Sequence, residues 1–357
     1  MTETESVAAP VTRKSITYAR YGSPLWQRVF LTREFAVILA VIIVAIVASS
    51  SIPRFGTPLT LSYLLLDLTP VLIIALPMTL ILISGEIDLS VASTVGVSNV
   101  VLGFLYAGGV PIELAMVICL AVGVFVGALN GFLVAVVGLP SLAVTIGTLA
   151  LFRGIAVGIL GTTSITTFPD FYKSLANANF PRTGIPLVMV LVAVLVITFA
   201  LLLHFTPFGR GIFATGRARE VARFSGVRVK RTKFILFVLS GLLASVAGIY
   251  YTFRYGSSRG DNAVGLELTV IAAVLLGGVS IFGGRGALHG VIGGVVLIGL
   301  LQSALRFSNV TSDVINIVTG ALLVASVVAP AVLVWLKGTI STRFIARPRS
   351  TRKVRLP

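Results

Sequence analysis

The chain has 357 residues, of which 56% are hydrophobic and only 11% are charged, with 28 lysines and arginines against 12 aspartates and glutamates. A water-soluble domain needs far more polar surface, so this composition excludes a soluble protein and indicates an integral membrane protein. The formal net charge of +16 does not indicate nucleic-acid binding, because the basic residues gather at the ends of apolar runs.

Ten apolar runs follow one another along the chain and predict an all-α polytopic membrane protein. A helix needs about 20 apolar residues to cross the hydrocarbon core of a bilayer. On that scale the predicted spans lie near 35–52, 62–84, 90–107, 112–137, 141–160, 186–205, 232–253, 265–282, 287–306 and 313–336. Together they form one transmembrane domain over 35–336. The first run begins too late to be a signal peptide, so we expect it to be retained.

Three segments hold most of the lysines and arginines: the N-terminal segment 1–34, the loop 207–232 and the tail 337–357. Cytoplasmic loops collect basic residues, and an even number of predicted spans separates each pair of these segments. The sequence therefore predicts that both termini and the loop 207–232 lie in the cytoplasm. The predicted outside loop 161–185 contains only Lys173 and Arg182 as basic residues.

Between the second and third spans, the stretch SGEIDLS contains Glu86, Asp88 and Ser90. Carboxylates at membrane depth are costly and usually line a cavity, form a pair or lie at the interface. If both spans are straight, this turn lies at the cytoplasmic face and Asp88 or Ser90 caps the third span. If the second span is broken, the turn faces the translocation path. The sequence supports both interpretations equally.

Four further polar residues lie inside or beside predicted spans: Asn99, Asn130, Thr145 and Arg153. One interpretation is hydrogen bonding between helices, or a guanidinium that reaches toward the membrane surface. The other is that they form, with Glu86, Asp88 and Ser90, the polar wall of a path for a hydroxylated solute. A sugar needs many donors and acceptors but no countercharge, so a path with few ions suits it better than an amino acid.

The sequence contains no pattern typical of a catalytic or metal site. His204 and His289 are the only histidines, and no cluster of histidine and cysteine has metal-ligand spacing. The stretch GVSIFGGR at 278–285 has the G-x-x-x-x-G of a phosphate-binding loop, but Gly-Arg stands where Lys-Ser or Lys-Thr is required. We therefore expect no ATP site, no metal and no bound cofactor on this chain.

The loop between the sixth and seventh spans contains the charged stretch GRAREVARFSG, residues 216–226. Its spacing predicts a short amphipathic helix, with Val221 and Phe224 on one side and Arg219 and Arg223 on another. On charge alone, this is a solvated loop or a helix that lies on anionic lipid.

The same stretch resembles a motif of bacterial ABC importer permeases. Glu220, Val221, Ala222 and Gly226 are similar to its E-A-A-x-x-x-G pattern, and Val221 departs from it at the second position. The stretches 80–96, 138–156, 208–249 and 268–294 resemble the ribose-type permease family, which transports monosaccharides and autoinducer-2 and shares a superfamily with branched-chain amino-acid permeases. The resemblance covers about residues 60–330.

The resemblance implies that the loop 207–232 holds a coupling helix, which docks into a groove of a separate ATP-hydrolysing subunit. Phe224 and Val221 would enter an apolar notch, the arginines would pair with carboxylates at its rim, and Gly226 would end the helix in a left-handed conformation. The residues expected to couple to the ATPase are Arg217, Arg219, Glu220, Ala222, Phe224 and Gly226.

The resemblance also implies partners and a location. We expect a second permease chain, identical or paralogous, and an extracytoplasmic solute-binding protein, in a multi-pass assembly of the bacterial cytoplasmic membrane. ATP and magnesium would bind to the partner ATPase. Ribose, xylose, rhamnose and autoinducer-2 stay open as solutes. The alternatives are a branched-chain amino-acid or nucleoside ABC permease and an ion-coupled secondary transporter, for which Glu86 and Asp88 are the candidate coupling residues.

Overall fold

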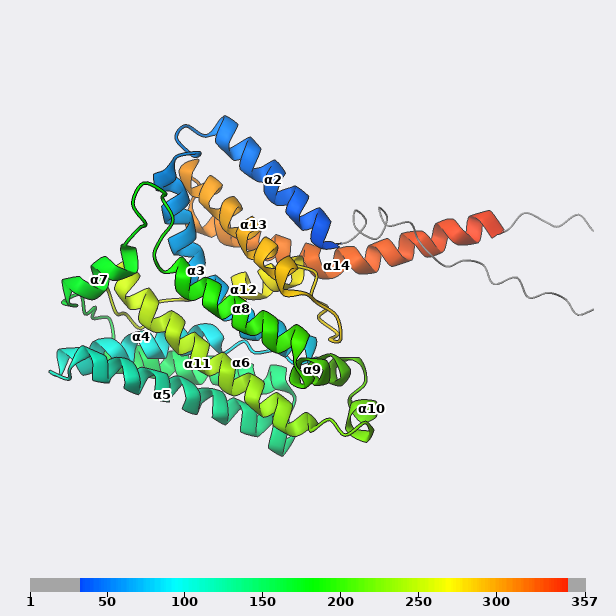
Figure 1. Cartoon of the computed structure of the whole chain (residues 1–357), viewed down its shortest axis with the longest axis horizontal. Helices are drawn as coiled ribbons and strands as arrows, with labels where there is room; N and C mark the ends of the chain where they lie inside the picture. The colour runs from blue at the N-terminus through cyan, green and yellow to red at the C-terminus, as the bar shows by residue number, and fades with distance from the viewer. Residues whose placement is uncertain (1–32, 346–357) are drawn as a thin grey trace, which may run out of the picture.

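Each of the ten predicted apolar runs contains a helix in the structure, a computed structural model that describes residues 33–345 (Figure 1). All of the described elements are helices: α2 (Arg33–Ser51), α3 (Pro58–Ile83), α4 (Val91–Ala107), α5 (Ile112–Gly131), the π-helix η1 (Phe132–Val137), α6 (Ser141–Leu160), α7 (Asp170–Asn177), α8 (Met189–Phe205), α9 (Pro207–Arg217), α10 (Arg219–Phe224), α11 (Val229–Tyr255), α12 (Leu266–Leu276), α13 (Leu288–Phe307) and α14 (Ser312–Ile345).

The two predicted basic ends lie largely outside the described residues. The N-terminal segment 1–34 is described only at its last two positions, where α2 begins. The predicted tail 337–357 begins inside α14, because that helix continues to Ile345. The last predicted span therefore belongs to a helix that continues beyond residue 336.

Five helices are long and apolar enough to cross a membrane among the residues that the structure describes, and α8 and α9 form a sixth if that bent pair is one span. Four shorter apolar helices, within α2, α4, α12 and α14, have 10–17 residues. The predicted span 265–282 is wrong in its length, since α12 has only 11 residues and ends at Leu276. At a rise of about 1.5 Å per residue, 11 residues do not cross the bilayer. Gly277 and Gly278 stop the helix, and Gly278 has a φ of +92°.

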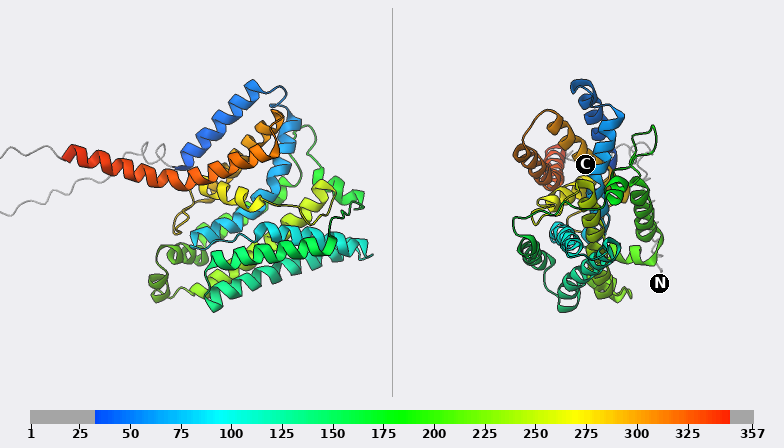
Figure 2. Two further views of the ribbon diagram at one scale, coloured as in Figure 1. Left: turned by 180° about the vertical axis from the view of Figure 1, so that it is seen from behind. Right: turned by 90° about the vertical axis from the view of Figure 1, so that its left-hand side faces the viewer.

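Helix α3 lies between two groups of helices (Figures 1 and 2). On one side α11 packs against α5 and α4, and α4 packs against α6. On the other side α13 packs against α2 and α12, and α12 packs against α14. The most apolar 18-residue stretch of α3 is 94% buried, which explains why its sequence is hydrophobic all round.

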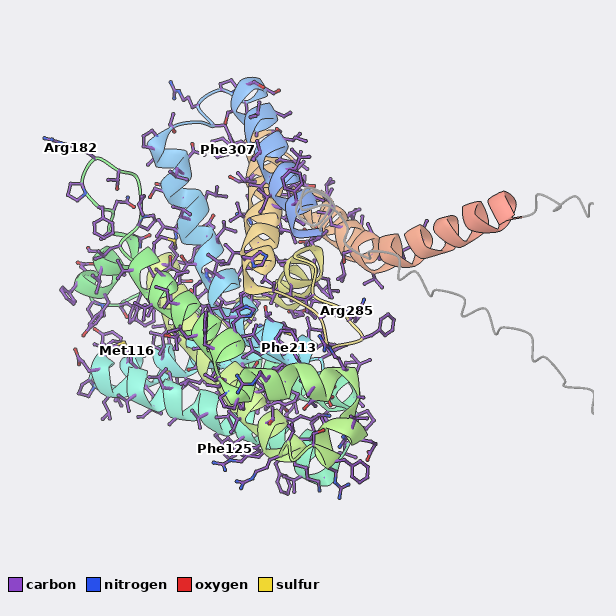
Figure 3. The ribbon with its side chains drawn as sticks, turned by 45° about the vertical axis from the view of Figure 1, so that its right-hand side comes forward. Met116, Phe125, Arg182, Phe213, Arg285 and Phe307 are labelled. Carbon is purple, nitrogen blue, oxygen red and sulfur yellow. The ribbon has the colours of Figure 1, made fainter. Side chains whose placement is uncertain are left out.

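The tight contact of α5 with α11 depends on small residues. A methyl group on Gly123 would lie 2.5 Å from the carbonyl oxygen of Gly241, so both backbones approach too closely for a side chain. On its other face α5 is apolar and exposed, and Phe125 points away from the bundle with 68% of its surface accessible (Figure 3). That outer face is suited to contact with lipid.

Candidate functional site

The basic loop after α8 folds into two helices rather than one. The Thr206 hydroxyl accepts a hydrogen bond from Gly209 N at 3.2 Å and begins α9, which bends by 68° away from α8. Ala218 is extended, with φ −159° and ψ 100°, and separates α9 from α10. The predicted single helix is therefore corrected, since Gly216 and Arg217 belong to the end of α9 and only 219–224 forms the second helix.

Helix α10 presents an apolar face that none of the described residues 33–345 covers. Phe224 is 87% exposed and Val221 63% exposed, whereas Ala222 is buried against the rest of the loop. Gly226 has the expected left-handed conformation, with a φ of +84°, and its N–H donates to the carbonyl of Arg223 at 3.1 Å. The turn holds α10 as a short rigid element with two large apolar side chains pointing outward.

The C-terminal end of α9 contacts the backbone of two other segments. Gly284 N donates to the carbonyl of Ile83 at 2.8 Å, which joins the end of α3 to the loop 277–287. Gly216 lies against both, because a methyl group there would be 1.8 Å from the Ile83 oxygen and 2.5 Å from Gly284 N. Arg217 Nε donates to the Gly284 carbonyl at 3.3 Å. Arg285 of the same loop lies beside α9 (Figure 3).

The loop 277–287 includes the stretch that imitates a phosphate-binding motif. Ser280 N donates to the Arg285 carbonyl at 3.0 Å, and Gly283 N donates to the Ser280 carbonyl at 3.0 Å. Gly283 and Gly284 have φ values of +80° and +69°, which only glycine adopts readily. These bonds form a tight turn that packs against α9. The sequence of this turn lacks the Lys-Ser pair of a phosphate-binding loop.

The turn between α3 and α4 lies at the same end of the bundle as α9. Glu86 forms an ion pair with Lys233 of α11, and the two side chains are only 13% and 5% exposed. The structure thus places Glu86 beside the start of α11, next to the basic loop. This position corresponds to the first of the two sequence interpretations, in which both spans end at this turn.

Asp88 does not cap α4, which corrects one detail of that interpretation. Its carboxylate accepts hydrogen bonds from Ser90 N at 3.0 Å, Ser90 Oγ at 2.6 Å and Ser240 Oγ of α11 at 2.8 Å. Ser90 occupies the N-cap position, but its hydroxyl makes no capping bond and instead accepts from Asn130 Nδ2 at 2.8 Å. The bonds among Asp88, Ser90, Asn130 and Ser240 join α4, α5 and α11. The Thr145 hydroxyl donates to the Ser141 carbonyl at 2.9 Å within α6.

Asn99 and Arg153 hold the loop after α11. Asn99 is fully buried, donates to Thr252 Oγ1 at 2.7 Å and accepts from Arg259 N at 2.9 Å. Arg153 Nη1 donates to the carbonyls of Asn262 at 2.7 Å and Gly260 at 3.2 Å. The bond from Asn99 to Thr252 joins α4 to α11, which corresponds to the interhelical interpretation, whereas Arg153 of α6 bonds to the backbone of a loop. Their expected place on a translocation path stays a prediction.

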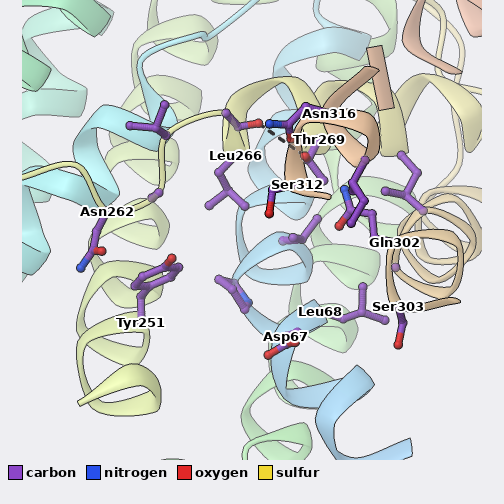
Figure 4. A pocket seen from close by; sticks show the side chains of 18 of the residues that line it. Asp67, Leu68, Tyr251, Asn262, Leu266, Thr269, Gln302, Ser303, Ser312 and Asn316 are labelled. Atoms are coloured by element: carbon purple, nitrogen blue, oxygen red, sulfur yellow. Dashed lines mark hydrogen bonds between the residues drawn. The ribbon is translucent and has the colours of Figure 1, made fainter. Parts of the chain in front are cut away.

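A polar cavity of about 450 Å³ lies at the other end of α11, remote from α10. Figure 4 shows Asp67 of α3, Tyr251 of α11 and Gln302 of α13 around it. None of the seven residues predicted to line the path is among the residues that line this cavity. Asp67 was missed, although a lone carboxylate inside the predicted span 62–84 is a signal that could have identified it.

The loop beside this cavity contains a charged pair outside the helices. Arg259 donates to Asp261 through Nε at 2.9 Å and through Nη2 at 2.8 Å. This hydrogen bonding holds the pKa of the Asp261 carboxyl below its ordinary value. No group of three or more potential metal ligands occurs within the described part of the chain.

Comparison with known proteins adds a family and several relatives. A family model described as a branched-chain amino acid transport system / permease component matches residues 60–327. The Autoinducer 2 import system permease protein LsrD of Yersinia enterocolitica is 36% identical over 266 residues, which cover 73% of this chain and 80% of that protein. The proteins of the same name from Photorhabdus laumondii and Escherichia coli K12 are both 35% identical, and they cover 84% and 82% of this chain and 91% and 90% of their own length. No solved structure matches the chain.

Proposed function

Because this chain belongs to the family of branched-chain amino acid transport system permease components, we propose that it is the transmembrane permease subunit of an ATP-driven importer. The observation that carries the proposal is α10, a short helix whose Phe224 is 87% exposed while Ala222 beneath it is buried. An exposed phenylalanine on a rigid basic loop suits a protein partner, because burying it in a groove contributes about 1.5–3 kcal/mol.

The ATPase is a separate subunit that binds α10 and carries ATP and magnesium. Val221 and Phe224 enter an apolar groove, while Arg219 and Arg223 pair with carboxylates at its rim. Glu220 and Arg217 complete the polar edge of the contact. Arg217 has a second role, because its Nε donates to the Gly284 carbonyl of the loop 277–287 at 3.3 Å. It therefore lies between the ATPase surface and the membrane helices.

Force passes from α10 through α9 to the membrane domain by direct backbone contact. Gly216 touches both Ile83 and Gly284, so a displacement of α9 moves the end of α3 and the loop after α12 together. ATP binding closes the ATPase dimer, pushes on α10 and turns the permease from inward-facing to outward-facing. Hydrolysis resets it.

The solute is a small sugar-like molecule, supplied by an extracytoplasmic binding protein to a pair of permease chains. Three relatives, which match this chain over 80–91% of their own length, are named for autoinducer 2 import. Most polar groups of the membrane domain are uncharged, and such groups suit hydroxyl groups better than the separated charges of an amino acid. The branched-chain amino-acid or nucleoside alternative differs in the binding protein.

The chain crosses the bacterial cytoplasmic membrane ten times, with both termini and the basic loop in the cytoplasm. Each of the ten apolar runs contains a helix, and we propose that the short α12 crosses together with part of the loop that follows it. The ion-coupled alternative is weaker. Glu86 is paired with Lys233, and Asp88 accepts three hydrogen bonds, so neither carboxylate is free to bind a coupling ion.

Purification from the native membrane in mild detergent tests the proposal. An ATPase should accompany the wild-type chain and be lost from the double variant Glu220→Ala with Gly226→Pro. A matched control is Glu113→Ala with Gly109→Pro, because Gly109 has a φ of +85° against +84° for Gly226 and likewise has no atom within 4 Å of an added methyl group. An ATPase that stays with the first variant, or never accompanies the wild type, contradicts the proposal.

A further inference from the structure

The cavity at the outer end of α11 has the size and composition of a small-molecule site. Its volume of about 450 Å³ falls within the range of about 300–1,000 Å³ that ligand pockets span. Helices α3, α11, α13 and α14 and the loop 259–265 all contribute to its wall. All of these segments belong to this chain.

Three polar side chains of the wall have no role in holding the fold. The hydroxyl groups of Ser303 and Ser312 and the amide of Asn316 line the cavity and have no hydrogen-bond partner among the described residues. Figure 4 shows these side chains on the α13 and α14 sides of the space. Each hydroxyl group offers three hydrogen-bonding positions and the amide offers four. All three groups line the same cavity.

The charged residues of the wall are already paired with one another. Asp67 accepts from Arg254 at 3.1 Å and from Arg306 at 3.5 Å, and Asp261 is bonded to Arg259 at 2.8 Å. Each carboxylate of the wall is thus paired with at least one guanidinium, which leaves no unpaired carboxylate for an ammonium group, while the remaining lone pairs and N–H groups still bond a hydroxyl. The cavity therefore favours an uncharged polar molecule over an amino acid.

Two tyrosines add aromatic surface to a wall that also contains aliphatic residues such as Leu68 and Ile298. The rings of Tyr251 and Tyr255 lie 4.4 Å apart between centroids, and both side chains line the cavity. Aromatic rings beside fixed polar groups give a ligand one apolar contact surface and one hydrogen-bonding edge. The C–H faces and hydroxyl edges of a small sugar present the same two kinds of surface.

From these features we propose that the cavity bounded by Asp67, Tyr251, Tyr255, Ser303, Ser312 and Asn316 is a binding site for a small uncharged polyhydroxylated solute, held within one chain. The inference rests on the proposed function and specifies where the solute first binds to the permease. The site lies at the end of α11 remote from α10, so it receives the solute before the ATPase-driven step.

Protection of a cysteine from labelling tests the site without measuring transport. Ser303→Cys places a thiol on the wall, and the native Cys119 is fully buried in α5 and should not react. The purified complex is labelled with a small maleimide in the presence of D-ribose, D-xylose, L-rhamnose, autoinducer 2 or L-leucine. At about ten times the dissociation constant, the bound solute should slow the reaction about tenfold.

Ser326→Cys is the matched control, because Ser326 lies on α14 outside the cavity and bonds only to the Leu323 carbonyl of its own helix. Its labelling should not change with any of the five compounds. Protection of the thiol at position 303 by at least one sugar and not by L-leucine supports the proposal. Protection by L-leucine alone, or by none of the compounds, overturns it.

A steric variant separates this inference from the proposed function. Ser303→Trp should fill the cavity and abolish uptake of the protecting sugar, while the ATPase still co-purifies; Ser326→Trp should leave uptake unchanged. If the ATPase binds but no sugar protects, the importer account stands and the site is refuted. If a sugar protects but no ATPase is found, the site stands and the importer account is refuted.

Discussion

Replacement of Gly216 by alanine tests whether α9 transmits movement to the membrane helices. The added methyl group would lie 1.8 Å from the Ile83 carbonyl oxygen and 2.5 Å from Gly284 N, and real contacts of this kind stay above 3.0 Å. The backbones must therefore separate by about 1.2 Å. We expect about 1–3 kcal/mol of overpacking cost and about 1 kcal/mol from loss of the bond between Gly284 and Ile83.

The assay combines thermal unfolding of the complex in detergent with ATP-driven uptake in proteoliposomes. Gly216→Ala should be less stable and should lose uptake, while the ATPase still binds, because α10 is unchanged. Gly158→Ala is the matched control, since no atom lies within 4 Å of a methyl group there and alanine favours a helix by about 0.5–1 kcal/mol over glycine. Equal stability and equal uptake for the two variants would refute the role assigned to Gly216.

Three further predictions concern other contacts. Phe224→Ala should weaken ATPase binding about 30-fold, equivalent to about 2 kcal/mol, without changing the stability of the isolated chain; a binding titration measures this. Lys233→Met should destabilise the chain by about 3 kcal/mol because it leaves the carboxylate of Glu86 buried without a partner, and the double variant with Glu86→Gln should recover most of the loss in thermal unfolding. The lowered pKa of the Asp261 carboxyl stabilises the folded state at a pH above the ordinary carboxyl pKa, and this contribution is lost as the pH falls through the lowered value. Arg259→Gln should therefore reduce the loss of unfolding free energy at acid pH by less than about 1 kcal/mol.

Hydropathy alone predicts where the helices lie, because each apolar run has to satisfy its own backbone inside a membrane. The sequence 141–160, for example, forms α6 over the same residues. The family predicted from four stretches of the sequence is confirmed by the family model and the relatives. The length of α12 was predicted wrongly, because the apolar residues after Leu276 continue the hydropathy signal through a glycine-rich loop that is not helical.

The contacts of polar residues could not be read from the sequence. For Asn99 and Asn130, which lie inside apolar spans, the sequence left both a path wall and interhelical bonding open, and only the structure shows their partners, Thr252 and Ser90. Ser303 and Asn316 look like ordinary residues near helix ends, and only the packing of α13 and α14 brings them to one cavity. The break at Ala218 follows directly after the part of α9 that packs against Ile83 and Gly284, which are distant in sequence.

The central claim is that α10 is the surface on which a separate ATPase docks. The most direct measurement is photo-crosslinking in the native membrane from p-benzoylphenylalanine in place of Phe224, with the adduct identified by mass spectrometry. The account predicts a covalent adduct with an ATP-hydrolysing subunit, and none from the same probe in place of Phe125, which is exposed on the outer face of α5. An adduct from position 224 with lipid alone would contradict the account.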